Sequence, residues 1–224
     1  MYTVHTLFVE MSTGAQAATA SNNSLPAQNF DFFLVLDFEA TCDSATKIVP
    51  QEIIEFPVLK INGKTFETET EFHTYVQPTA NPRLTPFCTE LTGITQDKVD
   101  GKPTLQETMK IFEKWMEEQG FLDGRCSFVF VTCGDWDLKT MLPGQCSHFR
   151  IHLPQYFKTW INIKRTFQHV MGQYPKEDLM GMLKGLSITH QGRHHSGIDD
   201  CRNIANILKA LAERGCIFQP TYRL

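Results

Sequence analysis

The sequence has no paired-cysteine motif, no long apolar run and no excess of basic residues, and each absence excludes a class of protein. Its seven cysteines are odd in number and form no CxxC pair, which argues against a disulfide framework or a structural zinc site. No apolar run is long enough to span a membrane, so we expect no membrane association. The formal charge of −4 gives no overall basic footprint for nucleic acid. Nucleic-acid chemistry stays compatible with this charge, because metal ions and a local basic rim can contact phosphates.

The chain has the composition of a folded α/β protein with one domain and a tail. Its 42% hydrophobic and 21% charged residues are typical of a globular protein, and 224 residues suffice for a full core. Residues 1–29 are in their greater part small, polar and without periodicity, so we predict a disordered tail followed by a domain over 30–224. The start lacks a basic region and contains Glu10, which is unlike a signal peptide. We therefore expect an intracellular protein, in the cytoplasm, the nucleus or both.

The hydrophobic pattern predicts a mixed sheet with three antiparallel strands, then parallel strands, flanked by helices. A hairpin signal at Asn62-Gly63 joins the second and third strands, and later strands each lead into a helix. The predicted strands cover residues 32–41, 52–61, about 66–76, 127–132 and 159–163. The first predicted helix begins at a capping box of Thr104 and Glu107, and the second follows Gly134. Three more helices are predicted: one that ends at about residue 171, one over about 178–186 and one over 197–214. Residues 78–103 are predicted to form loops with a short helix.

Two carboxylates stand at the end of the first predicted strand. Because strand side chains alternate, Asp37 and Glu39 lie on the same face as Phe33 and Val35, and both point into the same space. A buried pair of this kind is costly without a counter-ion. The spacing therefore favours a divalent cation at this place.

Two later segments supply further groups of the same kind. Asp135-Trp136-Asp137 stands where a strand changes to a helix, and residues 194–200 open the last helix with two histidines and two aspartates. If these segments meet the first strand, four carboxylates could bind two divalent ions about 4 Å apart, the arrangement used in phosphodiester hydrolysis. A histidine would then be the general base that activates water.

Helical phase selects between the paired candidates. On the last helix Asp200 shares a face with Ile204 and Leu208, whereas Asp199 shares one with Asn203. We therefore choose Asp200 together with His195, five residues earlier, in preference to Asp199 with His194. The same test is weaker at the other segment, where we take Asp137 as the ligand and Asp135 as a solvent-side or N-cap residue.

These motifs resemble those of a known family. Asp37-Phe38-Glu39-Ala40-Thr41, Trp136-Asp137 and His195-(four residues)-Asp200, in that order, are similar to the three exonuclease motifs of the DEDDh group of the DEDD superfamily. Within it, the runs FLVLDFEATC, FCTELTGITQ and HHSGIDDCRNIANIL resemble the ERI-type 3′–5′ exoribonucleases, over about residue 30 to the C-terminus. The resemblance implies a ribonuclease-H-like fold, two Mg²⁺ or Mn²⁺ ions and release of 5′-mononucleotides from a 3′ end.

The resemblance also implies roles for particular residues. The metal-binding carboxylates would be Asp37, Glu39, Asp137 and Asp200, with His195 as the base. The terminal nucleotides would contact the residues Glu39, Ala40, Thr41, Leu91, Ile94, Trp136 and His195. Where Trp136 stands, relatives have Phe or Tyr, and many have an Asn upstream that Thr132-Cys133-Gly134 lacks. The implied partner is a single-stranded 3′ end, RNA in preference to DNA, with protein partners for targeting and a monomeric enzyme.

Several alternatives stay open from the sequence. The substrate could be DNA, or the chain could be a binding module that keeps the fold without turnover. Trp136, Leu91 and Ile94 could be ordinary core residues rather than nucleotide contacts. The basic residues Lys158, Lys164, Arg165, Lys176, Lys184 and Arg193 could be a solvated face or a rim that guides a phosphate backbone.

Overall fold

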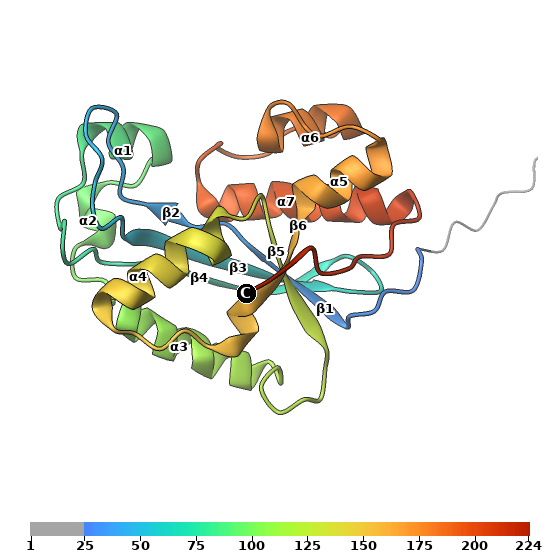
Figure 1. Cartoon of the computed structure of the whole chain (residues 1–224), viewed down its shortest axis with the longest axis horizontal. Coiled ribbons are helices and arrows are strands. Elements are labelled where there is room, and N and C mark those ends of the chain that lie inside the picture. Colours follow the sequence, from blue (N-terminus) through green and yellow to red (C-terminus); the bar gives the residue numbers. More distant parts are fainter. Residues whose placement is uncertain (1–24) are drawn as a thin grey trace, which may run out of the picture.

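The computed structural model describes residues 25–224, which form a seven-stranded mixed sheet with helices on both faces (Figure 1). In chain order the strands are β1 (Phe32–Leu36), β2 (Glu39–Ala40), β3 (Ile53–Asn62), β4 (Thr68–Tyr75), β5 (Phe128–Thr132), β6 (Thr159–Asn162) and β7 (Tyr222–Arg223). Strand β3 pairs antiparallel with β1, β2 and β4, while β1, β5 and β6 run parallel. The predicted mixed sheet is confirmed. Strand β7, which pairs antiparallel with β6, was not predicted.

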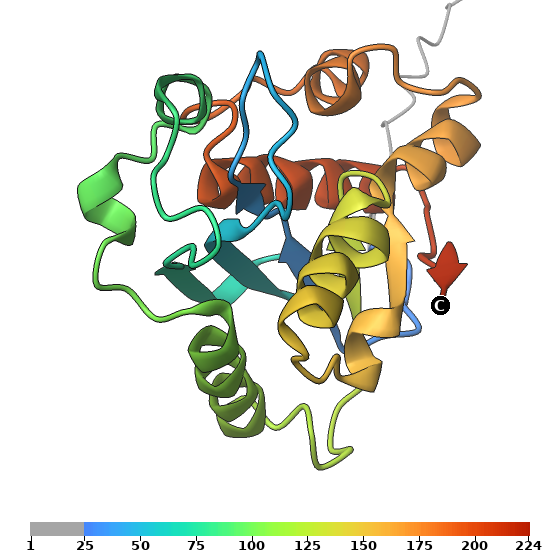
Figure 2. The same ribbon diagram turned by 60° about the vertical axis from the view of Figure 1, so that its left-hand side comes forward.

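Helices cover the sheet in two layers. They are α1 (Pro86–Thr92), α2 (Gln96–Val99), α3 (Leu105–Glu118), α4 (Leu142–Phe149), α5 (Ile163–Met171), α6 (Asp178–Leu186) and α7 (Gly197–Glu213), with a π-helical segment η1 (Asp137–Met141) and a 3₁₀ segment η2 (Gln155–Lys158). Helices α5, α6 and α7 lie on one face and α3 and α4 on the other (Figures 1 and 2). The predicted capping box at Thr104 and Glu107 is present and opens α3.

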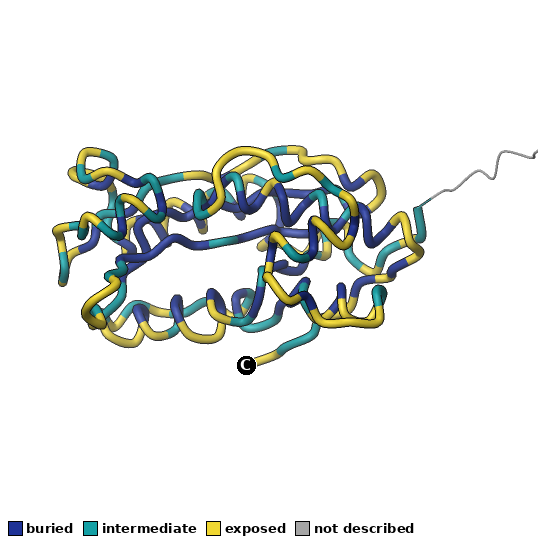
Figure 3. Tube along the Cα trace, turned by 90° about the horizontal axis from the view of Figure 1, so that it is seen from above, coloured by how far each residue is buried: buried dark blue, intermediate teal, exposed yellow. Residues whose placement is uncertain are grey.

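Strand β1 runs through the middle of the core, and its side chains alternate as predicted. Phe33 and Val35 pack toward α7, whereas Leu34 and Leu36 pack toward α3, and all four are fully buried. Burial of each such side chain contributes about 1.5–3 kcal/mol. Figure 3 shows the buried trace along the middle of the molecule, with exposed residues on the outer sides of the helices. The end of β1 is therefore held rigidly from both faces.

The first strand is shorter than the sequence predicts. It ends at Leu36, and after Asp37 and Phe38 the chain pairs again with β3 only as the two-residue β2. The break coincides with a contact that is distant in sequence, because the backbone N–H of Phe38 donates to Asp137 Oδ1 at 2.9 Å instead of to a neighbouring strand. The interruption lies at the carboxylates themselves.

The ordered contacts begin a little before the boundary expected at residue 30. Leu25 packs against the core on the α7 side, and Gln28 exchanges hydrogen bonds with Cys216 and Phe218. Composition could not reveal these contacts, since their partners lie near the other end of the chain. Residues 1–24 of the predicted tail lie outside the described residues. Within 25–224, no helix is long and apolar enough to cross a membrane.

Candidate active site

Asp37 and Glu39 stand at the carboxyl end of β1, the central strand. Asp37 is partly exposed, whereas Glu39 is 8% exposed and paired through its backbone with Glu55 of β3. Thr41 extends this edge, because its hydroxyl accepts the N–H of Glu52 at 3.0 Å. The predicted placement of both carboxylates on one side is consistent with the effect of the Glu39 charge on the pKa of Asp37, described below.

Asp137 opens the π-helical segment that follows β5. Its side chain is 3% exposed and accepts the N–H of Phe38, so it lies directly beside the break between Asp37 and Glu39. The turn before it is held without an asparagine, since the Thr132 hydroxyl donates to the carbonyl of Gly134 at 2.6 Å. Asp135 points elsewhere: it accepts from the Trp160 indole and pairs with Arg165. The structure thus places Asp137, and not Asp135, with the other carboxylates.

Asp200 lies in the first turn of α7, and His195 lies in the loop directly before this helix. Asp200 is 3% exposed, and its Oδ2 accepts the backbone N–H of His195 at 2.9 Å. Possible ligand atoms of Glu39, His195 and Asp200 lie within 4.8 Å of one another. Asp200, which helical phase selected over Asp199, is thus the buried aspartate of the two. The described structure brings together all five residues predicted for the catalytic centre.

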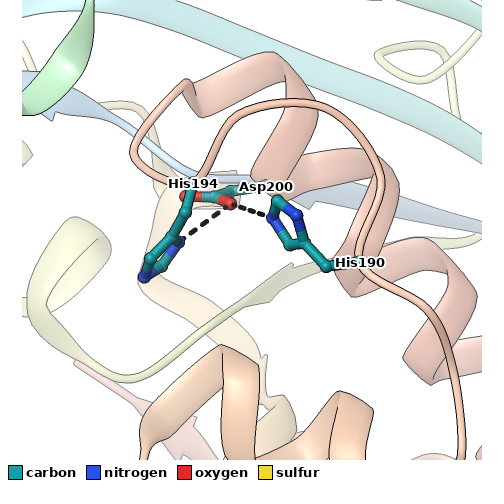
Figure 4. Close-up of side chains that lie close together, drawn as sticks. All are labelled: His190, His194 and Asp200. Carbon is teal, nitrogen blue, oxygen red and sulfur yellow. Dashed lines mark hydrogen bonds and ion pairs between the residues drawn. The ribbon is translucent and has the colours of Figure 1, made fainter.

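The two other histidines near Asp200 were not predicted to lie there together. His194 Nδ1 is 3.3 Å from Asp200 Oδ1, and His190 Nε2 is 3.9 Å from the same oxygen (Figure 4). The ring of His194 stacks on that of His195, with centroids 3.9 Å apart. Both histidines thus contact Asp200, His194 through its ring and His195 through its backbone N–H, while a ring nitrogen of His195 also lies within 4.8 Å of possible ligand atoms of Glu39 and Asp200.

Burial disfavours the charged forms of all four carboxylates, and at Asp37 and Glu39 the charges of neighbouring carboxylates add to this effect. Burial, then the charges of Asp137 and Glu39, raises the pKa of Asp37 well above its usual range. Burial and the neighbouring carboxylates raise the pKa of Glu39 to about 9. Burial raises the pKa of Asp137 to about 6, against the opposing hydrogen bond from Phe38, and also raises that of Asp200. Asp37 and Glu39 are therefore the least compensated as anions, whereas hydrogen bonds partly stabilise the charged forms of Asp137 and Asp200.

This donor set fits divalent cations. Within residues 25–224, no lysine or arginine side chain forms an ion pair with any of the four carboxylates. Carboxylate oxygens are the ligands that Mg²⁺ and Mn²⁺ prefer. A cation among them would replace repulsion by attraction and lower the same pKa values. The residues present thus match the metal ions that the motifs imply.

Glu55 is a residue of this site that the sequence did not single out. It is 1% exposed on β3, its Oε1 lies 2.7 Å from His73 Nε2, and its Oε2 accepts the N–H of Gly197 at 3.0 Å. Gly197 begins α7, and a Cβ there would lie 2.6 Å from the carbonyl oxygen of Asp37. Glu55 thus fixes the start of α7 against the end of β1. Its position on a buried strand was visible in the sequence, but its partner lies 142 residues away.

The residues predicted to contact terminal nucleotides differ in exposure. Trp136 is 40% exposed beside Asp137, so it is not a core residue. Leu91 on α1 is half-buried, whereas Ile94 is 1% exposed in a small cluster with Ile54 and Val99, which favours its alternative interpretation as a core residue. Ala40 and Thr41 are buried beside Glu39.

Arg193 connects α1 to the loop before α7. Its guanidinium donates to the carbonyl oxygens of Glu90 and Leu91, and α1 lies near the N-terminal end of α7 in both views (Figures 1 and 2). The sequence had left Arg193 among the candidate basic rim residues. In the structure it holds the segment that carries Leu91 close to the histidines.

The fold and the site define a class of protein: nucleases with a ribonuclease-H-like sheet and a carboxylate centre. A family model described as exonuclease (RNase_T) matches residues 34–208, and the chain belongs to this family, in its DEDDh group. Enzymes of this group use divalent metal ions.

Individual relatives agree with the assignment. The chain is 57% identical to human ERI1 exoribonuclease 3 over 208 residues, which cover 93% of the chain and 61% of that protein. It thus spans about three fifths of the length of the curated relative. The nuclease domain of 3′hExo, a DEDDh family member, bound to rAMP, has 35% identity and a TM-score of 0.85, over 89% of this chain and 100% of that one. A 3′-exonuclease that recognises the 3′ end of the histone mRNA stem-loop has 34% identity and a TM-score of 0.84, over 88% and 68%.

Proposed function

We propose that this chain is a metal-dependent 3′–5′ exoribonuclease that hydrolyses the terminal phosphodiester bond and releases 5′-mononucleotides. The observation that carries the proposal is the convergence of four carboxylates and a histidine from β1, β2, η1 and α7 on one place. Membership of the exonuclease family supports the same reaction.

The carboxylates of Asp37, Glu39, Asp137 and Asp200 would hold two Mg²⁺ or Mn²⁺ ions. Such ions, when bound, neutralise the charge of the scissile phosphate and stabilise the attacking and leaving oxygens. The chain's own contribution is to fix the carboxylates: Phe38 orients Asp137, the backbone of His195 orients Asp200, and Glu55 fixes the start of α7. Preorganised ligands of this kind avoid the cost of ordering the site during each reaction.

His195 acts as the general base in this proposal. Burial and the neighbouring His194 lower its pKa, so the imidazole is neutral near pH 7 and can accept a proton. It takes this proton from a water molecule that attacks phosphorus. The bond from phosphorus to the 3′ oxygen of the preceding nucleotide breaks, and that oxygen is protonated by solvent. The hydroxyl of water stays on the phosphate of the released nucleotide, and His195 then gives its proton to solvent, which balances the proton taken up by the 3′ oxygen.

The 3′-terminal nucleotide would lie between Trp136 and α1. The exposed indole beside Asp137 offers a face for a base to stack on, and Leu91 on α1 offers an apolar contact. Glu39, Ala40 and Thr41 form the adjoining edge of the sheet. RNA is favoured over DNA because relatives of high identity are named exoribonucleases, and one is described with a histone mRNA stem-loop.

The proposal is tested with matched 5′-labelled RNA and DNA single strands, each with a free or phosphate-blocked 3′ end. We expect a ladder of progressively shorter products from free-ended RNA with Mg²⁺ or Mn²⁺, less from DNA, and none with chelator. Cleavage within blocked strands would contradict an exonuclease. Equal rates on RNA and DNA would contradict the proposed preference for RNA. Binding of the strands without any product would identify a binding module.

A further inference from the structure

A second group of possible metal ligands lies on the outer side of Asp200. It consists of His190, His194 and Asp200, each of which offers a ligand atom within 4.8 Å of those of the other two. The rings of both histidines face the same oxygen, Asp200 Oδ1 (Figure 4). His190 Nε2 is buried and has no hydrogen-bond partner among the described residues, although it points at Asp200 from 3.9 Å. A buried polar atom without a partner is costly and calls for an explanation. A metal ion bound between the three groups would supply this explanation.

The loop that carries the two histidines is fastened to α7 on both sides. The buried Asn203 accepts the N–H of Gln191 at 3.0 Å and donates to the Gln191 carbonyl at 2.8 Å. Asp199 accepts the N–H of Arg193 at 3.0 Å. Gly192 allows this approach, because a Cβ there would lie 2.4 Å from the Asp199 carboxyl carbon. The backbone that carries the two imidazoles is therefore held against α7.

The chemistry of the three donors selects a particular kind of ion. Two imidazoles and one carboxylate are typical ligands of Zn²⁺ and similar transition metals, whereas Mg²⁺ prefers oxygen donors alone. With metal–ligand bonds of about 2.0–2.1 Å, donors of a tetrahedral zinc lie about 3.3–3.5 Å apart. The two observed separations from Asp200 Oδ1, 3.3 and 3.9 Å, are close to this value. A modest rotation of His190 would complete three-ligand coordination.

We propose that His190, His194 and Asp200 form a zinc-binding site that is separate from the carboxylate centre but shares Asp200 with it, and that zinc bound there inhibits the nuclease. Zinc on Asp200 Oδ1 would withdraw that oxygen from the catalytic ions. Zinc would also bring positive charge to His194, whose ring stacks on that of His195 with centroids 3.9 Å apart. This charge would disturb His195, the proposed base. The proposed zinc binding does not depend on the proposed nuclease function, while the proposed inhibition rests on it.

The binding is tested in an Asp37→Ala background, which weakens the carboxylate centre. Zinc affinity is measured by competition with a chromophoric chelator in excess Mg²⁺. We expect one zinc ion per chain, and at least about tenfold weaker binding after His194→Ala or His190→Ala, since losing even an outer partner of a zinc ligand costs about 10- to 100-fold. His152→Ala, which removes an exposed histidine after α4, is the matched control and should bind zinc unchanged.

The inhibition is tested in the otherwise wild-type chain. Each protein's Mg²⁺-dependent rate is measured against added ZnCl₂ and expressed relative to its own rate without zinc. We expect the His190→Ala and His194→Ala chains to need at least about tenfold more zinc for half inhibition than the wild type or His152→Ala. Because His194 is 40% exposed, its replacement should leave the thermal midpoint nearly unchanged.

The two arms separate the possible failures. Zinc binding that is equal in all variants would overturn the site. Binding that depends on the histidines with equal inhibition of all variants would overturn the inhibitory role. If no chain shows nuclease activity, the proposed function fails, but the binding arm still decides whether the zinc site exists.

Discussion

Glu52 and Glu39 are both buried carboxylates at the same edge of the sheet, yet their surroundings are opposite. Glu52 is 1% exposed and accepts the backbone N–H groups of Thr79, Ala80 and Asn81 at 2.6–2.9 Å. Glu39 is 8% exposed and faces other carboxylates, which together with burial raise its pKa to about 9. The fold itself supplies the partners of Glu52, so its role is structural. Glu39 lacks such partners, and the difference marks where a cation is needed.

Glu55 stands between these two cases. Like Glu52 it is satisfied, by His73 and by the N-terminus of α7, but what it fixes is the element that carries Asp200 and His195. A buried acid is therefore not informative by itself. Its hydrogen-bond partners show whether it stabilises the fold, positions residues of the site or needs a bound cation.

The largest effect is expected for Asp37→Ala. The change should abolish nuclease activity, because Asp37 lies among the other three carboxylates. Removal of a carboxyl group whose burial is unfavourable should leave the thermal midpoint in chelator equal to that of the wild type or higher. Asp135→Asn, at a carboxylate outside the centre, is the control and should keep most of its activity. An active Asp37→Ala enzyme would contradict the assignment.

The next effect is expected for His195→Ala. Loss of a general base lowers rates by about 10²–10⁴-fold, and we expect a decrease in that range with Mn²⁺ affinity retained. Because the pKa of His195 is below its ordinary value, wild-type activity should fall as the pH falls through that pKa, and this acidic limb should be absent in the variant. Rate–pH profiles of both proteins measure this. An unchanged acidic limb would assign the titration to another group.

Glu52→Ala should affect stability rather than chemistry. It leaves three backbone N–H groups without their acceptor, which should lower the free energy of unfolding by about 3 kcal/mol. Urea denaturation measures the loss, and the rate per folded molecule should stay close to that of the wild type. If activity per folded molecule fell as far as in His195→Ala, the contrast between Glu52 and the site would fail.

A smaller effect is expected in the pH dependence of stability. In chelator, the raised pKa of about 9 means that the folded protein keeps a proton on Glu39 up to about pH 9, whereas the unfolded chain releases it near pH 4.5. The free energy of unfolding should therefore decrease as the pH rises between these values, by up to about 1.4 kcal/mol per pH unit for one proton. Saturating Mn²⁺ should flatten this slope. Denaturation at several pH values, with and without metal, would show an equal slope in both conditions if the carboxylates bind no cation.

The sequence predicts those parts of the site that depend on local periodicity. Alternation along the first strand placed Asp37 and Glu39 together, and helical phase selected Asp200 over Asp199. The broken strand at Phe38 and the role of Glu55 could not be predicted, because each depends on a partner about 100 or more residues away. The two-residue β7 was missed since such a short edge strand has no periodicity to detect. The cluster of His190 and His194 depends on how the loop folds back on Asn203.

The central claim is that the carboxylates of this centre need a cation and that those elsewhere do not. The most direct test is to follow the degradation of a 5′-labelled RNA by the wild type, Asp37→Ala and Glu52→Ala across a Mn²⁺ titration, at a temperature where all are folded. The account predicts saturable, Mn²⁺-dependent shortening by the wild type and Glu52→Ala, with the same half-saturating concentration, and none by Asp37→Ala. Activity in chelator, or an Asp37→Ala chain that responds to Mn²⁺ like the wild type, would contradict it.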